Sequence, residues 1–381
     1  MTVRNRTEDQ AQTTNFDAAD RRFMALALTL GRRGLGRTWP NPAVGAVVVR
    51  DGVVVGRGWT QPGGRPHAEP VALEQAGEAA RDATLYVTLE PCSHIGKSPP
   101  CTDAVIAAGI KRVVSAIEDP NPEVAGQGHA KLRAAGIDVD IGLGAAEATR
   151  AHAGHFRRVR DHRPHVILKL AVSTDEKIAA AGGKTVAISG EAAKARVHLL
   201  RAQCDAILVG IGTVLADDPL LTCRLPRMEA RSPVRVVLDR SLRIPTASRL
   251  VHSARSTPLW VVTSEVAEAP AAAKLGAAGA HVIRIAQASA TGLDLPATLH
   301  LLAERRITRL LVEGGSHVAA SFVTAGLVDE VWLLRGAAAI GNDGVPALNA
   351  LPLAAITASS AFAVRASEKL DQDTLTMYER I

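Results

Sequence analysis

Short apolar runs rich in β-branched residues alternate with longer segments of helical period in the first 150 residues. Two of the runs, 46–49 and 53–55, are joined by the turn-forming pair Asp51-Gly52, which predicts a β-hairpin. Further strands are expected at 83–89, 112–117 and 137–143, and helices at 21–31, 67–75, 102–108 and 126–135. This alternation predicts an α/β domain with a mostly parallel sheet.

The second half of the chain repeats the alternation without repeating any motif of the first half. Strands are expected at 166–170, 206–209, 234–238, 259–262, 282–285, 310–312 and 331–334, and helices near 190–203, 295–305 and 316–325. The stretch 152–164 is rich in arginine and histidine and ends in a proline, which favours a domain boundary there. We therefore predict a disordered leader at 1–20, a first domain at 21–163 and a second at 164–381.

Composition narrows the functional classes. The chain has 381 residues, 47% of them hydrophobic, which is enough for two cored domains. Its net charge of +6 is spread over both halves, and aromatic residues make up only 3%, so small anionic substrates are favoured over a nucleic-acid groove with stacking platforms.

Cysteine usage and hydropathy favour a cytoplasmic protein. Four cysteines in so long a chain do not form a disulfide framework, which fits a reducing compartment. No apolar run reaches membrane-spanning length, and the first twenty residues do not resemble a signal peptide, so we expect no membrane association.

The main group of potentially catalytic and metal-binding residues in the first domain is His67-Ala68-Glu69, followed by Cys92 and Cys101. One imidazole and two thiols match a three-ligand zinc site, which keeps a fourth position for water and lowers its pKa towards about 7. Glu69 would then move protons, as in a hydrolytic deaminase. Each cysteine opens an expected helix, where the helix dipole favours the thiolate that a metal needs.

Each of these residues also has a simpler interpretation. A lone histidine is usually structural, and a lone buried cysteine is usually a small hydrophobic residue. A closed structural zinc site would need a fourth protein ligand, for which His94 is the nearest candidate. The gap between Cys92 and Cys101 is also wider than the Pro-Cys-x-x-Cys spacing of nucleobase deaminases.

In the second domain the best local signal is Glu313-Gly314-Gly315-Ser316, between an expected strand and an expected helix. Free backbone N–H groups at such a helix start can bind a cofactor phosphate. A simple tight turn is the alternative, and no G-x-G-x-x-G motif is present.

Together the motifs resemble the family of bifunctional riboflavin-biosynthesis deaminase–reductases over nearly the whole chain after the leader. In the first half the resemblance rests on Pro40-Asn41-Pro42-Ala43-Val44-Gly45, His67-Ala68-Glu69, the segment 88–101 and Asp119-Pro120-Asn121-Pro122. In the second half it rests on Lys169-Leu170, Leu199-Leu200-Arg201, the segment 213–224, Val236-Val237-Leu238-Asp239 and Glu313-Gly314-Gly315.

The resemblance implies a cytidine-deaminase-like α/β/α domain followed by a dihydrofolate-reductase-like α/β domain. The first would deaminate 2,5-diamino-6-(5-phosphoribosylamino)pyrimidin-4(3H)-one, with zinc on His67, Cys92 and Cys101 and with Glu69 as the catalytic residue. The second would use NADPH to reduce the ribosyl group of the product to ribityl. A homo-oligomer, a dimer or higher, is also implied.

Substrate contacts in the first domain are expected from Asn41, His94 and Lys97. The loop between the cysteines carries His94 and Lys97, and a lysine there can meet a ribose 5-phosphate as a point charge. Asn41 can offer a donor and an acceptor to a pyrimidine edge. An ordinary solvated lysine and a purely turn-forming asparagine are the alternatives.

The resemblance also implies site residues in the second domain. Lys169 and Asp217 would lie near the hydride-transfer centre. The residues expected at the substrate are Thr185, Arg201, Leu221, Arg224 and Glu313. Those expected at the cofactor are Ala171, Ala187, Thr213, Asp217, Gly314, Gly315 and Ser316. Arg201 has a surface position as its alternative, and Asp217-Asp218-Pro219 could instead be a capping and turn element.

Three positions depart from the family pattern. Ser173-Thr174-Asp175-Glu176 replaces Ser-Leu-Asp-Gly, Ala187 stands where a tryptophan is common, and Arg240 stands where a small hydroxyl residue is common. The sequence therefore leaves open a deaminase with a decayed reductase domain. It also leaves open a nucleic-acid-editing deaminase, which the second domain and the Lys97 loop disfavour, and it does not rank NADPH over NADH.

Overall fold

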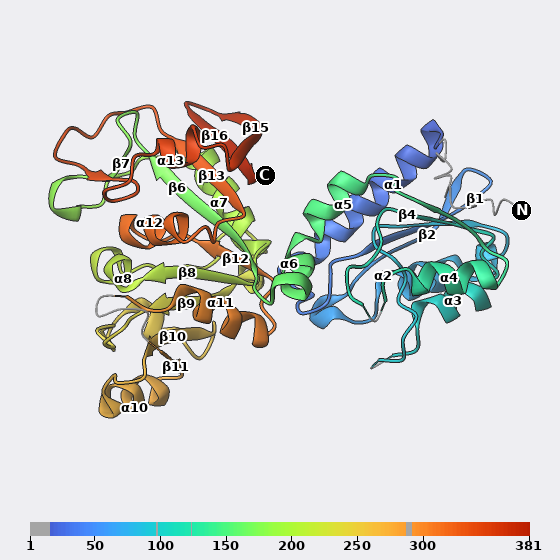
Figure 1. Ribbon diagram of the computed structural model, residues 1–381, viewed down its shortest axis with the longest axis horizontal. Coiled ribbons are helices and arrows are strands. Elements are labelled where there is room, and N and C mark those ends of the chain that lie inside the picture. Colours follow the sequence, from blue (N-terminus) through green and yellow to red (C-terminus); the bar gives the residue numbers. More distant parts are fainter. Residues whose placement is uncertain (1–15, 97, 123, 287–291) are drawn as a thin grey trace, which may run out of the picture. The chain divides into compact units, whose positions relative to one another are not determined.

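The computed structural model describes residues 16–96, 98–122, 124–286 and 292–381 (Figure 1). The chain forms two compact units, of which the first comprises residues up to 34 together with 43–61 and 65–152. The second comprises 35–42, 62–64 and 153–381. The described part of the expected leader begins at Phe16, and Ala18–Asp20 already belong to the first helix.

The first unit is built on a five-stranded sheet with the order β2-β1-β3-β4-β5. The strands are β1 (Gly45–Arg50), β2 (Val53–Trp59), β3 (Thr84–Val87), β4 (Arg112–Ser115) and β5 (Asp138–Ile141). Our expectation of a mostly parallel sheet is wrong, because only the pairings β3 with β4 and β4 with β5 are parallel. The 51–52 hairpin reverses the chain, and β1 pairs antiparallel with both β2 and β3.

The helices of this unit lie close to the expected positions. They are α1 (Ala18–Gly31), α2 (Ala68–Ala76), α3 (Cys101–Ala107), α4 (Gln127–Ala134) and α5 (Ala145–Ala151). The helix α1 begins three residues earlier than expected, because Asp17 and Asp20 form a capping box at its start.

Glycines allow two helices to lie directly on the first two strands. A Cβ atom at Gly45 would fall 1.9 Å from the carbonyl oxygen of Ala27 in α1. One at Gly58 would fall 2.1 Å from the carbonyl oxygen of Ala68 in α2. Because these neighbours are backbone atoms, no side-chain rotation could make room for a larger residue. The first turn of α2 is therefore seated on β2.

A buried carboxylate shapes the loop that precedes α4. Glu90 is 4% exposed, and its two oxygens accept four backbone N–H groups. The donors are those of Asp119, Gly126, Gly128 and His129. Glu90 lies near His129 and Glu118 in a grouping with the donor types of a metal site, but its lone pairs are already engaged, so we assign it to structure.

Burial of His129 predicts an acid-sensitive first unit. Its ring is 1% exposed, and burial, together with Arg133, lowers its pKa from 6.5 to about 4, against a smaller opposing effect of Glu118. The unfolded chain therefore takes up a proton below pH 6.5 that the folded chain does not take up until about pH 4. Stability is lost as the pH falls through this window, by about 2 kcal/mol at pH 5.

The expected result is a drop in the apparent melting temperature of this unit of about 5 °C between pH 7.5 and pH 5. His129→Leu should remove most of this drop. Calorimetry of both proteins at both pH values gives the comparison, and it cancels the common effect of acid on zinc binding. An equal drop in the two proteins would contradict the assignment to His129.

The second unit is built on a nine-stranded sheet with the order β11-β10-β9-β8-β12-β6-β13-β16-β15. The strands are β6 (His165–Val172), β8 (Ala206–Gly210), β9 (Val234–Leu238), β10 (Leu259–Ser264), β11 (His281–Ile285), β12 (Arg309–Val312), β13 (Glu330–Arg335), β15 (Phe362–Leu370) and β16 (Asp373–Arg380). The seven strands from β11 to β13 are parallel, whereas β16 runs antiparallel to β13 and β15. A separate ladder joins β7 (Lys177–Ala179) to β14 (Val345–Pro346).

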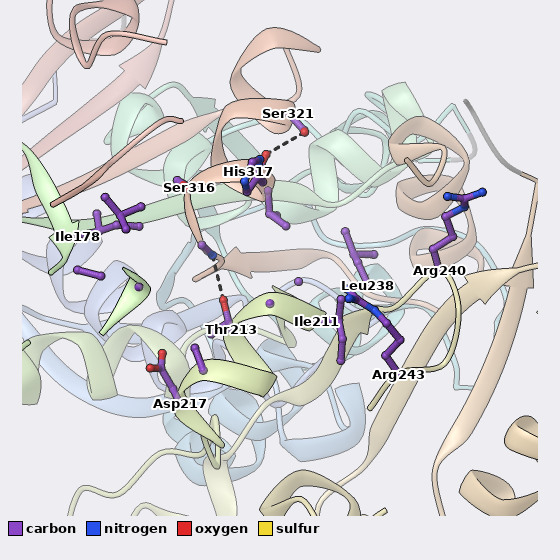
Figure 2. A pocket seen from close by; sticks show the side chains of 18 of the residues that line it. Ile178, Ile211, Thr213, Asp217, Leu238, Arg240, Arg243, Ser316, His317 and Ser321 are labelled. Atoms are coloured by element: carbon purple, nitrogen blue, oxygen red, sulfur yellow. Dashed lines mark hydrogen bonds between the residues drawn. The ribbon is translucent and has the colours of Figure 1, made fainter. Parts of the chain in front are cut away.

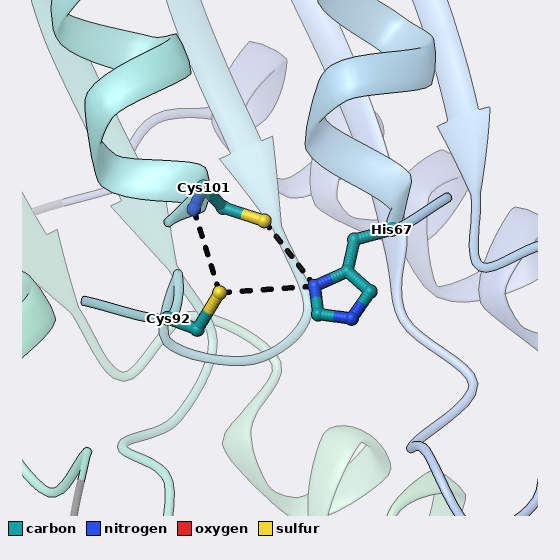
Figure 3. A group of neighbouring side chains, drawn as sticks. All are labelled: His67, Cys92 and Cys101. Carbon is teal, nitrogen blue, oxygen red and sulfur yellow. Dashed lines mark hydrogen bonds between the residues drawn. The ribbon is translucent and has the colours of Figure 1, made fainter. Parts of the chain in front are cut away.

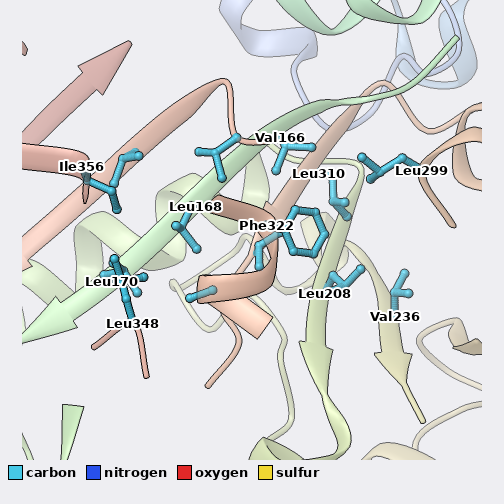
Figure 4. Packing of buried hydrophobic residues seen from close by; sticks show 14 of the residues in the cluster. Val166, Leu168, Leu170, Leu208, Val236, Leu299, Leu310, Phe322, Leu348 and Ile356 are labelled. Atoms are coloured by element: carbon cyan, nitrogen blue, oxygen red, sulfur yellow. The ribbon is translucent and has the colours of Figure 1, made fainter. Parts of the chain in front are cut away.

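Helices cover both faces of this sheet. They are α6 (Ala153–Asp161), α7 (Glu191–Ala202), α8 (Ile211–Asp217), α9 (Arg249–His252), α10 (Ala269–Ala277), α11 (Leu295–Glu304), α12 (Ser316–Thr324) and α13 (Ala354–Thr357). Successive residues of β6 enter different cores, Val166 and Leu168 one and Ile167 the other. Figure 4 shows Phe322 of α12 packed among the strand residues of the first core. Within the described residues, no helix is both long and apolar enough to cross a membrane.

Candidate active sites

The three expected metal ligands converge in the first unit (Figure 3). His67 is the N-cap residue of α2, Cys101 is the first residue of α3, and Cys92 lies in the loop after β3. Nδ1 of His67 is 3.3 Å from Sγ of Cys101 and 3.7 Å from Sγ of Cys92. The backbone N–H of Cys101 also donates to Sγ of Cys92 at 3.4 Å.

The chemistry of this set fits zinc. Two sulfurs and one imidazole nitrogen are donors that Zn²⁺ prefers, and all three atoms lie within 4.8 Å of one another. Hydrogen bonding from Cys101, assisted by His67, lowers the pKa of the Cys92 thiol to about 4, so this sulfur is ready as a thiolate. The pKa of Cys101 is raised, because its thiol donates to Cys92 and is buried. Within the described residues the grouping holds no fourth His, Cys, Asp or Glu, as expected for an open site.

Glu69 lies in the first turn of α2 beside this set and is 3% exposed. Burial raises the pKa of its carboxyl group to about 7, against the attraction of His67. The charge of Glu69 in turn helps to raise the pKa of the Cys101 thiol. A carboxyl group enclosed beside a metal site is placed to accept a proton and release it again.

The loop between Cys92 and Cys101 contains two residues that are expected to contact the substrate, His94 and Lys97. His94 is exposed and lies beside Gly96, and Lys97 lies outside the described residues. Sequence reasoning missed Arg65, whose Nη1 donates to Oγ of Ser98 at 2.9 Å and so ties this loop to the segment before His67. Its position two residues before the expected metal ligand His67 was the available signal.

Asn41 belongs to the segment 35–42, which groups with the second unit. Its Nδ2 donates to the carbonyl oxygen of Gly64 at 2.8 Å, and its carbonyl oxygen accepts from Oγ1 of Thr38. These bonds give it a turn-forming role, and its expected contact with a pyrimidine stays a prediction.

A large cleft opens in the second unit at the carboxyl ends of β9, β8 and β12 (Figure 2). Its volume is about 880 Å³. A smaller cavity of about 350 Å³ adjoins it, and the two share Ile178, Thr213, Asp217 and Gly315 as lining residues. Ligands of open parallel sheets bind at this edge, so one continuous site for a long ligand and a second molecule is expected.

The smaller cavity contains a buried group of charges. Nε and Nη2 of Arg201 donate to the two carboxylate oxygens of Glu313 at 2.8 and 2.9 Å. Nζ of Lys169 lies 3.9 Å from Glu313. Burial alone would raise the pKa of Glu313, but attraction to Arg201 outweighs it and lowers the pKa to about 2. Burial lowers the pKa of Lys169, and Glu313 opposes this shift.

Most of the expected reductase residues line this cleft. The smaller cavity is lined by Lys169, Ala171, Ala187, Arg201, Thr213, Asp217, Leu221, Glu313, Gly314 and Gly315. Thr185 and Ser316 line the larger cavity. Oγ1 of Thr213 accepts from the backbone N–H of Gly315 at 3.1 Å, and Thr185 hydrogen-bonds Asp217. Asp217 thus lies at the junction of the cavities, while the individual roles stay predictions.

Among the substrate residues expected in the second unit, Arg224 is the one that lines neither cavity. Burial and the nearby charge of Arg201 lower the pKa of its guanidinium. The ring of His198 accepts from the backbone N–H of Arg224 at 3.3 Å, and burial lowers its pKa with help from Arg201 and Arg224. Lys194 lines the smaller cavity. Sequence reasoning missed Lys194 and His198. They lie seven and three residues before Arg201 on the same helix, and this spacing on one helix face was the available signal.

The segment 173–176, which departs from the family pattern, shows a structural consequence of this departure. Glu176 adopts φ of 61°, so the position requires the left-handed conformation that glycine adopts without cost. Its carboxylate lies 3.5 Å from Arg335. The preceding Asp175 accepts from Ser173 and from the backbone N–H groups of Ile340 and Gly341, so the loop keeps its anchor.

Glu176→Gly is expected to stabilise the second unit slightly. Removal of the side chain relieves left-handed strain worth about 1 kcal/mol, which exceeds the value of one exposed ion pair. Part of this gain is cancelled by the greater freedom of glycine in the unfolded chain. Urea unfolding should therefore show a midpoint equal to or slightly above that of the wild type, and a clear loss of stability would contradict this account.

Comparisons with known proteins support this arrangement. Residues 17–117 match the cytidine and deoxycytidylate deaminase zinc-binding region, and residues 164–375 match the RibD C-terminal domain. The chain is 40% identical to riboflavin biosynthesis protein RibD of Aquifex aeolicus over 95% of this chain and 98% of that one. It is 41% identical to RibD of Escherichia coli over 85% and 89%.

Solved structures agree with these matches. One form of Acinetobacter baumannii RibD superposes with a TM-score of 0.84 at 34% identity, covering 95% of this chain and 99% of that one. A diaminohydroxyphosphoribosylaminopyrimidine deaminase/5-amino-6-(5-phosphoribosylamino)uracil reductase from Thermotoga maritima gives 0.83 at 36% identity with the same coverage.

Proposed function

Because the chain belongs to the RibD family, we propose that it performs two successive steps of riboflavin biosynthesis on one phosphorylated pyrimidine. The first is hydrolytic deamination of 2,5-diamino-6-(5-phosphoribosylamino)pyrimidin-4(3H)-one. The second is reduction of the ribosyl group of 5-amino-6-(5-phosphoribosylamino)uracil to ribityl. The observation that carries the proposal is that one chain holds both the His67, Cys92 and Cys101 set with buried Glu69 and the cleft around Lys169 and Glu313.

His67, Cys92 and Cys101 would hold zinc, which when bound would supply a Lewis acid that makes water nucleophilic near neutral pH. Glu69 does the proton transfer. It takes a proton from the attacking water and delivers it to the departing amino group. The second proton of the water ends on the ring nitrogen, so that the reaction consumes water and releases ammonia. Burial of Glu69 beside the ligands keeps this transfer away from bulk solvent.

The residues that line the two cavities would hold NADPH, which when bound would supply a hydride for the second step. Ring opening of the ribosylamine exposes a carbon–nitrogen double bond at C1′, which takes the hydride at carbon and a proton at nitrogen. Lys169 is the candidate proton donor, because burial lowers the pKa of its ammonium group and Glu313 holds it in the smaller cavity. Arg201 fixes Glu313 through two parallel hydrogen bonds.

The substrate phosphate is expected at basic residues in both sites. In the second unit Lys194, Arg201 and Arg224 supply positive charge at or near the smaller cavity, and the neutral ring of His198 lies among them. A cytoplasmic location and a homo-oligomeric state remain part of this proposal. Light scattering of the purified protein tests the oligomeric state, and a monomer at all concentrations would contradict it.

A coupled assay tests the two activities together. The protein is mixed with the diaminopyrimidine nucleotide and NADPH, and ammonia and absorbance at the NADPH band are followed. Ammonia release should come first, and NADPH consumption should follow it in equal amount. A flat NADPH trace with active deamination, repeated with the deaminated intermediate, would instead show a deaminase with an inactive second unit, to which Ala187 and Glu176 could contribute.

A further inference from the structure

The loop between Cys92 and Cys101 is fixed at its base. The backbone N–H of Thr102 donates to the carbonyl oxygen of Cys92 at 3.2 Å, and that of Cys101 donates to Sγ of Cys92 at 3.4 Å. The tip is held differently. Of the described residues in 93–99, only Ser98 forms a hydrogen bond to the rest of the chain. The position of the tip therefore depends on the partner of Ser98.

That partner is Arg65, a half-buried residue in the segment that leads into α2. Its Nη1 donates to Oγ of Ser98 at 2.9 Å. A Cβ atom placed on Gly96 would lie 3.6 Å from Nη2 of Arg65 and 3.8 Å from Nε2 of His94. The guanidinium of Arg65 and the imidazole of His94 therefore lie beside the same point of the tip.

Arg65 binds no carboxylate among the described residues, and the acceptor that it uses is a neutral hydroxyl group. An arginine that holds the fold together is bound differently in the second unit, where Arg163 donates to both carboxylate oxygens of Asp329. The positive charge of Arg65 is thus not neutralised by a neighbouring carboxylate. Together with His94 it gives this side of the loop a character that suits a phosphate group.

Resting on the proposed deaminase function, we propose that Arg65 is a positioning residue for the phosphate end of the nucleotide. By holding Ser98 it fixes the tip of the loop before the substrate arrives, with the imidazole of His94 on the side where the phosphate is expected. A loop that is already ordered loses little conformational entropy on binding, so the nucleotide binds more tightly. Because Arg65 acts through Ser98, it affects the affinity for the substrate and not the chemical step.

The test compares two substrates of the full-length, zinc-loaded protein. One is the diaminopyrimidine nucleotide, the other is the nucleoside that lacks its phosphate, and ammonia release gives kcat and KM for each. The wild type should have a KM for the nucleotide that is lower by about tenfold or more. Arg65→Ala should raise the KM of the nucleotide about 10-fold, leave its kcat within about twofold and leave the KM of the nucleoside unchanged.

Ser98→Ala separates a positioning role of Arg65 from direct contact with the phosphate. It removes the acceptor and keeps the charge of Arg65, so a positioning role predicts the same rise in the KM of the nucleotide. The double variant Arg65→Ala/Ser98→Ala should show no further rise, because both changes break one interaction. Arg65→Lys keeps a cation that can donate to Ser98 and should restore most of the lost affinity. A wild-type KM in Ser98→Ala would overturn the inference, since Arg65 would then act by itself.

Arg57→Ala is the matched control, because Arg57 is exposed on β2 of the same unit, and it should change neither KM. Metal analysis should find about one zinc ion per chain in every variant. Loss of zinc from Arg65→Ala, or an equal rise in both of its KM values, would make Arg65 a structural residue and overturn the inference. Equal KM values of the two compounds for the wild type would also overturn it, while leaving the deaminase proposal intact. Failure of the wild type to deaminate either compound would overturn both.

Discussion

Glu69→Gln is expected to lower the rate of ammonia release about 10³-fold. The amide keeps the shape of the side chain but cannot shuttle a proton, and a positioned general acid–base group contributes a factor of this order. Zinc content should stay at about one ion per chain, because His67, Cys92 and Cys101 are untouched. Reduction of the deaminated intermediate should also be unchanged, since Glu69 belongs to the first unit. Ammonia release, metal analysis and NADPH absorbance measure the three quantities.

Glu74→Gln is the matched control, because Glu74 is exposed on the same helix α2. It should retain full deaminase activity. If Glu69→Gln instead loses zinc or unfolds, the set is a structural metal site. Full activity of Glu69→Gln would show that another group moves the proton.

Glu313→Gln is expected to have the largest effect on the second unit. It leaves Arg201 and Lys169 buried without their carboxylate, which should cost about 3 kcal/mol of folding free energy. Reductase activity should fall about 100-fold, because the fork of Arg201 no longer fixes the cavity wall. Loss of the negative charge also lowers the pKa of Lys169 further, so the alkaline limb of the pH–rate profile should move to lower pH.

Urea unfolding and a pH series of NADPH consumption check these effects, and deaminase activity reports that the first unit is folded. Glu304→Gln, exposed on α11, is the control and should match the wild type. Unchanged reductase activity with an unshifted alkaline limb would contradict the role of Lys169 as proton donor.

Local patterns in the sequence were sufficient to predict most helices and strands of the first unit. The zinc set could be found because residue type, helix starts and strand ends are local features, and the structure brings His67, Cys92 and Cys101 together as expected. The antiparallel direction of β1 relative to β3 could not be predicted from local patterns. The partner of β1 on its other side is β3, and this pairing joins residues that are 35 to 41 positions apart in sequence.

The last two strands of the second unit were harder to predict. The hairpin of β15 and β16 was missed because β15 is an edge strand whose exposed positions break the apolar alternation. Lys194 and His198 were missed because a surface-like helix pattern gives no sign that one stripe faces a cavity. Glu176 shows the opposite case, since the sequence marked it as unusual and the structure gives the reason in its positive φ.

The contact of Gly58 with the first turn of α2 bears on how this deaminase could acquire a new specificity. Because the carbonyl oxygen of Ala68 occupies the place of any side chain at position 58, the scaffold under His67 and Glu69 tolerates almost no variation. At Gly96, in the loop between the two cysteines, the nearest atoms that a Cβ would meet are side-chain atoms of Arg65 and His94, at 3.6 Å or more. A library designed to change the accepted pyrimidine should therefore concentrate its diversity in that loop and keep the glycines of the first two strands constant.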